Sequence, residues 1–183
     1  VVMVDGKDTA ATREHVSSAY AKDDWAKGYD FVLHNECYGA VKDPALIERI
    51  AKPHRAGLPG VFLHCSAHSY RMADNADLWR EVLGAKTTFH EPGAVLTAKV
   101  VTPNHPVMRG FPAEFTTAEK DELYVVEKLW DSALVLGAAY SEKRKADNPV
   151  IWVNEAGKLR SFCTTLGHPN STMERPEYLD LVA

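Results

Sequence analysis

Two short apolar runs on either side of a helical segment most constrain the fold of this chain. The first run, YDFVLHNE, spans residues 29–36, and the second, GVFLHC, spans residues 60–65. Between them, residues 43–57 begin with Asp43 as a helix N-cap and Pro44 in the first helical turn. A strand–helix–strand unit of this length is typical of a parallel sheet that is covered by helices.

The remaining elements extend this pattern and then change it. Residues 1–4 are strand-like, and residues 76–84 form a short amphipathic helical pattern. The second half is rich in strand-forming residues, with a hairpin over residues 148–168 and a last helix over residues 175–182. We therefore predict a three-layer α/β fold with a mostly parallel central sheet, flanking helices, and added antiparallel strands in the C-terminal half.

Composition and charge exclude several classes of protein. With 183 residues, 45% hydrophobic and 25% charged, the chain suits one soluble domain over residues 1–183. A net charge of −4 without a basic stripe argues against nucleic acid as a partner. No apolar run approaches the roughly 18 residues of a membrane span, and we expect no nucleotide cofactor. The chain starts and stops inside expected elements, so we expect truncation at both ends and a cytoplasmic or periplasmic location.

The cysteines do not form a recognisable framework. Cys37, Cys65 and Cys163 are odd in number and widely spaced, and no CxxC motif is present. We therefore expect reduced thiols.

Three of the expected strands end in polar residues that can take part in chemistry. In an open α/β sheet, ligands bind outside the carboxyl ends of the strands, so such ends converge on one region. Convergence is the simplest explanation for three strands ending in this way. The residues are His34, Asn35, Glu36 and Cys37 after the first run, His64, Cys65, Ser66 and His68 after the second, and Gly167, His168, Pro169 and Asn170 near the end of the chain.

Not every histidine belongs to a site. A lone histidine at a strand end is more often a hydrogen-bonded loop residue than a ligand. His64 and His68 differ, because two histidines in quick succession after an apolar strand favour a site, whereas His90 stays unassigned. The histidines that we interpret as ordinary hydrogen-bonded residues rather than ligands are His15, His54, which lies on a charged helix, and His105.

Nucleophilic catalysis by Cys65 is one use of the second polar strand end. A strained turn after a strand presents the nucleophile in such enzymes, and it needs small residues two positions before and after it. Leu63 and Ala67 occupy those positions. Leu63 fits poorly, so we regard this mechanism as the weakest of three.

A metal site and metal-free acid–base catalysis are the other two uses. Imidazoles and a carboxylate suit zinc and similar ions, and a His–Glu pair can also transfer protons. The spacing of His64 and His68 places both rings on one face only if the segment turns helical. Both mechanisms would use the same residues, which are His64, His68, His168 and Glu36.

The chain resembles the ThuA-like proteins, a family named for bacterial trehalose utilisation. The resemblance runs from about residue 29 to the C-terminus and rests on four segments in the same order: GVFLHCSAHSYR, HPVMRGF, DELY and GKLRSFCTTLGH. Leu159 stands where the family often has glycine, which we expect to alter the hairpin turn rather than the site.

This resemblance implies both a fold and a role. The fold is the class I glutamine-amidotransferase-like, or flavodoxin-like, α/β fold, usually without a working Cys–His–Glu triad and with an earlier first strand than any present here. The role is bacterial sugar catabolism, in particular of keto-disaccharides formed by a partner oxidoreductase. The residues that match the polar positions of the family are His64, His68, His168, Glu122 and Tyr124.

We therefore predict an enzyme for trehalose or a related keto-disaccharide or glycoside, with hydrolase, lyase or isomerase chemistry and no glutamine amidotransferase activity. The alternative is a non-catalytic sugar-binding or scaffold domain of a larger protein. We expect a small-molecule sugar as substrate, a homo-oligomer, and a partner oxidoreductase in the same pathway. The assigned residues are His64, His68, Glu36 and His168 for catalysis, Asn35, Glu122, Tyr124 and Cys65 for substrate binding, and His64, His68 and His168 for a divalent metal.

Overall fold

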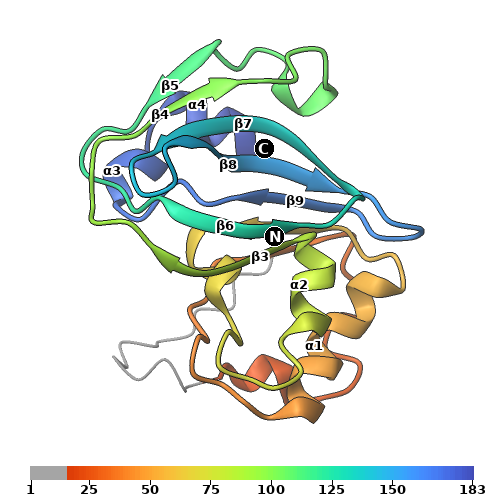
Figure 1. Cartoon of the computed structure of the whole chain (residues 1–183). Helices are drawn as coiled ribbons and strands as arrows, with labels where there is room; N and C mark the ends of the chain where they lie inside the picture. Colours follow the sequence, from red (N-terminus) through yellow and green to blue (C-terminus); the bar gives the residue numbers. More distant parts are fainter. Residues whose placement is uncertain (1–15) are drawn as a thin grey trace.

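A seven-stranded mixed sheet forms the centre of the protein (Figure 1). The structure is a computed structural model that describes residues 16–183, so the strand expected over residues 1–4 lies outside the described residues. Within the sheet, β1 pairs with β2 and β2 with β9 in parallel, and the other neighbours are antiparallel. In spatial order the strands are β1 (Val32–His34), β2 (Gly60–Leu63), β9 (Ser161–Thr164), β8 (Ala146–Asn154), β7 (Ala133–Ser141), β4 (Thr97–Val100) and β5 (Glu114–Thr116).

A two-stranded antiparallel ribbon lies beside this sheet. It pairs β3 (Ala85–His90) with β6 (Tyr124–Leu129), and its register places His90 opposite Tyr124. The sequence pattern did not indicate β3, because AKTTFH contains few strongly apolar residues. The helical elements are η1 (Ser18–Ala21), α1 (Pro44–Arg55), η2 (His64–His68), α2 (Asp77–Leu83), η3 (Pro106–Met108), α3 (Asn170–Met173) and α4 (Pro176–Val182).

Side chains of β8 show that the sheet is buried on both faces. Trp152 packs into the core that includes Ile47 of α1 and Trp79 of α2. Its neighbour Ile151 packs instead into the core that includes Leu181 of α4. Because successive residues of a strand point to opposite faces, the sheet is sandwiched between two helical layers. The predicted α/β fold with parallel core strands is confirmed, and its antiparallel part is larger than expected.

Local sequence signals explain where α1 and α2 begin and end. The Asp43 carboxylate accepts hydrogen bonds from the backbone N–H groups of Ala45 and Leu46, which confirms it as the N-cap of α1. Gly84 ends α2 in the left-handed conformation, with φ 73°.

We expect Gly84→Ala to lower the free energy of unfolding by about 2 kcal/mol, because it combines positive φ with a steric clash. A Cβ atom here would lie 2.6 Å from Cγ of Asn154, whose side chain donates to two carbonyls of α2. Gly157→Ala is the matched control, since Gly157 has φ 59° and no atom within 4 Å of the added Cβ. Urea unfolding that gives both variants the same loss would contradict the clash.

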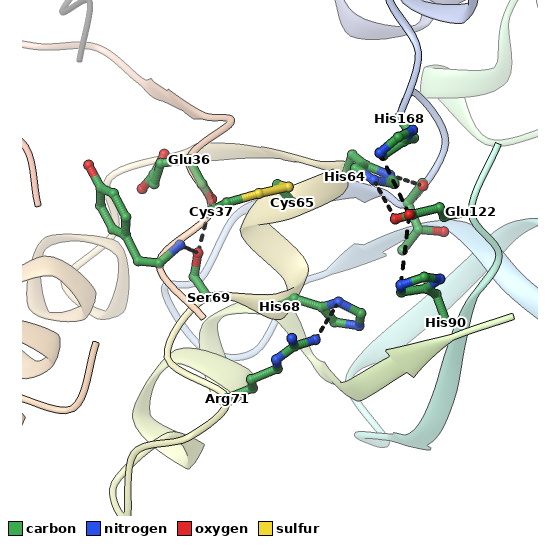
Figure 2. Close-up of a disulfide and its surroundings, with 12 residues drawn as sticks. Glu36, Cys37, His64, Cys65, His68, Ser69, Arg71, His90, Glu122 and His168 are labelled. Carbon is green, nitrogen blue, oxygen red and sulfur yellow. Dashed lines mark hydrogen bonds and ion pairs between the residues drawn. A yellow bond between two sulfur atoms is a disulfide. The ribbon is translucent and has the colours of Figure 1, made fainter. Parts of the chain in front are cut away.

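The structure corrects the expected redox state of two cysteines. Cys37 and Cys65 form a disulfide, although 28 positions separate them in sequence. The two residues follow β1 and β2, which are parallel neighbours, so their ends lie side by side (Figure 2). Sequence spacing alone conceals this proximity. Cys163 is a free, buried thiol, as expected.

No helix in residues 16–183 is long and apolar enough to cross a membrane.

Candidate metal centre

His64 occupies a strained position at the carboxyl end of β2. Its φ is +32°, and the chain turns there directly from β2 into the 3-10 helix η2. Nucleophiles of α/β hydrolases sit on strained strand-to-helix turns of this kind. Here an imidazole takes the strained position, and the next residue, Cys65, is held in a disulfide. The turn therefore presents His64 rather than a cysteine thiolate.

Glu122 is the point at which the polar side chains meet. Figure 2 shows His64, His90 and His168 around its carboxylate. The Nε2 atoms lie 3.5 Å away for His64, 3.7 Å for His90 and 3.6 Å for His168. His64 is buried, Glu122 is half-buried and His168 is exposed. The site thus has a buried inner side and an open outer side.

The hydrogen bond of His64 determines which ring nitrogen faces the site. Nδ1 lies 2.7 Å from the backbone oxygen of Thr165, so Nδ1–H is the donor. Nε2 is buried and has no hydrogen-bond partner. In the neutral ring, Nε2 therefore directs a lone pair towards the carboxylate of Glu122. A backbone carbonyl that fixes the far nitrogen in this way is typical of metal-binding histidines.

The spacing of the donor atoms suits a shared cation better than direct hydrogen bonds. The distances from Glu122 to His64 and His168 exceed the usual 2.9–3.0 Å of an N–H···O bond. Two ligands bound at about 2.1 Å to one tetrahedral ion are about 3.4 Å apart. The donor atoms of His64, Glu122 and His168 all lie within 4.8 Å of one another. This group could hold a metal ion with three protein ligands.

The neighbouring histidines keep Glu122 ionised. The imidazole of His64 beside the carboxylate is the largest influence and lowers the pKa of Glu122. Burial acts in the opposite direction, and the charges of His90 and His168 lower the pKa further. The net result is a pKa below the ordinary value of a glutamate, so the group is an anionic oxygen donor at neutral pH.

His68 lies outside the group of three donors, in contrast to the predicted ligand set. In a 3-10 helix, residues four positions apart point in directions about 120° apart, so His64 and His68 do not share a face. Arg71 donates to Nδ1 of His68, and Nε2–H donates to Thr87 Oγ1. Burial, followed by the charge of Arg71, lowers the pKa of His68 to about 3. The ring stacks on Tyr124, with centroids 3.6 Å apart.

Glu36 belongs to a different cluster, which we call the His34 network: Tyr20, His34, Glu36 and His54. Its carboxylate lies 2.7 Å from Nδ1 of His34, whose Nε2 lies 2.9 Å from Nε2 of His54. Tyr20 donates to the same carboxylate. His54, on α1, is only 1% exposed, and both of its ring nitrogens have hydrogen-bond partners. Asn35, between these residues in sequence, is exposed.

Other residues near the strand ends surround the group of His64, Glu122 and His168. Tyr124 is buried, and its ring centroid lies 4.5 Å from that of His64. Cys65 lies next to His64 but is covalently bonded to Cys37. His90, which sequence reasoning left unassigned, joins the site from β3. Recognising β3 as a strand would have placed His90 opposite Tyr124 and near Glu122.

Comparisons with known proteins agree with this architecture. The ThuA family, described as trehalose utilisation, matches residues 5–183. No curated protein matches the chain. A ThuA-like protein from Parabacteroides merdae is 18% identical with a TM-score of 0.69, over 84% of this chain and 67% of its own. A ThuA-like protein from Bacteroides uniformis, also 18% identical, has a TM-score of 0.68 over 87% of this chain and 68% of its own.

The same fold also occurs inside a larger glycosidase. The β-galactosidase from Rahnella sp. R3 is 18% identical with a TM-score of 0.59, over 85% of this chain but only 22% of its own. At such identities these structures show the fold alone. The family match covers the turn with His64, the segment with Glu122 and the loop with His168. The chain belongs to the ThuA, or trehalose utilisation, family.

Proposed function

We propose that this protein is a carbohydrate-processing enzyme in which His64, Glu122 and His168 hold a divalent metal such as zinc. The single observation that carries the proposal is the convergence of these three donors within 4.8 Å. Two imidazoles, one carboxylate and an open position form a common donor set of catalytic zinc sites. Membership of the trehalose utilisation family supports a sugar as the substrate.

A bound metal would supply Lewis-acid polarisation of a carbonyl or hydroxyl oxygen of the substrate. The protein residues supply orientation and proton transfer. The Thr165 carbonyl fixes the ring of His64, and the 52% exposure of the His168 side chain leaves the outer side open to a ligand. His90, with 41% of its side chain exposed and Nε2 at 3.7 Å from Glu122, is the residue to which we assign proton transfer with the substrate.

The substrate class follows from the family and from this chemistry. A keto-disaccharide or related glycoside has acidic C–H bonds beside its carbonyl, so one base and one electrophile suffice for isomerisation or elimination. Such a substrate requires an oxidoreductase to form it. Of the two expected compartments, the Cys37–Cys65 disulfide favours the periplasm, because disulfides persist in oxidising environments.

Metal content measured by inductively coupled plasma mass spectrometry tests the proposal. We expect about one zinc or similar ion per chain in protein purified without a metal-affinity tag. His64→Ala and His168→Ala should lose the ion, because each removes one of the three donors. His105→Ala is the matched control, since His105 caps η3 away from these residues.

Absence of metal from the wild-type protein, even after incubation with zinc, manganese and cobalt, would overturn the metal proposal. Turnover of the keto-disaccharide would then be compared between wild type and His64→Ala. Turnover by wild type alone would indicate metal-free acid–base catalysis, and no turnover by either would indicate a sugar-binding domain.

A further inference from the structure

Asp121 is a fully buried carboxylate next to the proposed metal centre. Its Oδ1 accepts hydrogen bonds from the backbone N–H groups of Glu122, at 2.8 Å, and His168, at 3.0 Å. Its Oδ2 accepts a third from the backbone N–H of Gly167, at 2.8 Å. One side chain therefore binds the main chain of two of the three proposed metal ligands.

These hydrogen bonds connect segments that are distant in sequence. Glu122 precedes β6, whereas Gly167 and His168 follow β9, 46 and 47 positions beyond Asp121. The backbone of Asp121 is itself fixed, because it pairs with Ala94 in both directions, at 2.8 Å and 3.0 Å. Asp121 therefore acts as a fixed point from which the loop of His168 is held against the segment of Glu122.

The loop is also confined on its other side. Gly167 has φ 104°, and a Cβ atom there would lie 2.9 Å from the hydroxyl of Tyr178 and 3.1 Å from the side chain of Met173. The Tyr178 hydroxyl donates to the backbone oxygen of Leu166. The peptide that carries His168 thus lies between Asp121 and α4, which leaves it little freedom to move.

The three backbone N–H groups that face Asp121 require a carboxylate as their acceptor. The carboxylate of Asp121 accepts hydrogen bonds from three backbone N–H groups. An asparagine has the same shape but only one acceptor oxygen. If that oxygen accepted from Glu122 and His168, the amide NH₂ would face the N–H of Gly167, and two donors would oppose each other.

We propose that Asp121 is the positioning residue of the metal centre, setting the separation between the carboxylate of Glu122 and the imidazole of His168. This inference rests on the proposed function. Groups that orient metal ligands typically change metal affinity by about 10- to 100-fold when they are replaced. We expect a change of that size in Asp121→Asn, although Asp121 itself is not a ligand.

Zinc affinity is measured by competition with a chromophoric chelator for wild type, Asp121→Asn and Asn154→Ala. Asn154→Ala is the control, because it removes buried hydrogen bonds to α2 elsewhere in the fold. The zinc affinity of Asp121→Asn should be about 10- to 100-fold weaker than that of wild type. This loss should exceed any loss in Asn154→Ala, even where the two variants have the same melting temperature. Equal affinities in the two variants would reduce Asp121 to a structural residue and overturn the inference.

Amide hydrogen exchange without metal separates this inference from the proposed function. We expect the amides of Gly167 and His168 to exchange at least about tenfold faster in Asp121→Asn than in wild type or Asn154→Ala. Unchanged exchange would overturn the positioning role. Wild type that binds no zinc, with faster exchange in Asp121→Asn, would instead refute the metal proposal and leave Asp121 as the residue that positions an acid–base pair.

Discussion

Between pH 7 and pH 3, we expect His54 alone to reduce the free energy of unfolding by about 4 kcal/mol. Burial is the main cause, and the charge of His34 the next, of a folded-state pKa of about 3 for His54. In the unfolded chain, the pKa returns to about 6.5. Between these values the unfolded chain binds one more proton than the folded protein. The contribution of His54 to the free energy of unfolding is therefore fully present above pH 6.5 and is lost as the pH falls towards 3.

The hydrogen bonds of the His34 network agree with a neutral His54. Nδ1 of His54 lies 2.9 Å from the carbonyl oxygen of Leu58, so this nitrogen carries the proton. Nε2 must then accept from Nε2–H of His34, and Nδ1 of His34 faces the carboxylate of Glu36. Burial alone would raise the pKa of Glu36, but the charge and hydrogen bond of His34 outweigh it and lower the pKa. Glu36 therefore also loses stabilising interactions as it is protonated in acid.

Urea unfolding of wild type and His54→Gln at half-unit pH intervals measures this effect. Glutamine can keep a hydrogen bond to Leu58 but does not titrate, so the variant should have a shallower pH slope between 6.5 and 4. Ile50→Val is the matched control, since Ile50 is fully buried in the same helix and its truncation lowers stability equally at every pH. Parallel curves for wild type and His54→Gln would refute the buried neutral imidazole.

Reduction of the Cys37–Cys65 disulfide should lower the free energy of unfolding by about 3–4 kcal/mol, from the loop-closure entropy of a 28-residue separation. The bond restricts the unfolded chain more than the folded one, in which β1 and β2 already hold the two cysteines together. Chemical unfolding with and without dithiothreitol gives the difference directly.

Cys37→Ser provides the control for this experiment. The variant should be as unstable as the reduced wild type, and dithiothreitol should not affect it further. Thiol titration of the denatured, unreduced wild type should detect one cysteine, Cys163. Detection of all three thiols would mean that the disulfide does not form.

The sequence predicted those features that depend on local patterns. The N-cap Asp43 and the C-cap Gly84 were recognisable because capping depends on residues that are close in sequence. The fold class followed from the strand–helix–strand pattern. Strand β3 was missed, because its stability comes from pairing with β6 rather than from a strong apolar alternation of its own.

The sequence brought only some of the candidate site residues together, for a related reason. His64 and His168 follow neighbouring strands, so the rule that strand ends converge was enough to bring them together. The rule cannot distinguish a 3-10 turn from an α-helix, so it did not show that His68 lies outside the group of His64, Glu122 and His168. It also placed Glu36 in the same site, whereas the side chain of Glu36 pairs with His34.

The three proposed ligands lie next to strands of two different sheets. His64 and His168 follow strands of the central sheet, whereas Glu122 precedes β6 of the β3–β6 ribbon. An ion bound by all three would therefore cross-link the ribbon to the sheet, and separation of the two would require its release. Free metal at 100 times its dissociation constant would stabilise the folded protein by about 2.7 kcal/mol. The melting temperature of this protein would then report on the metal supply of the cell.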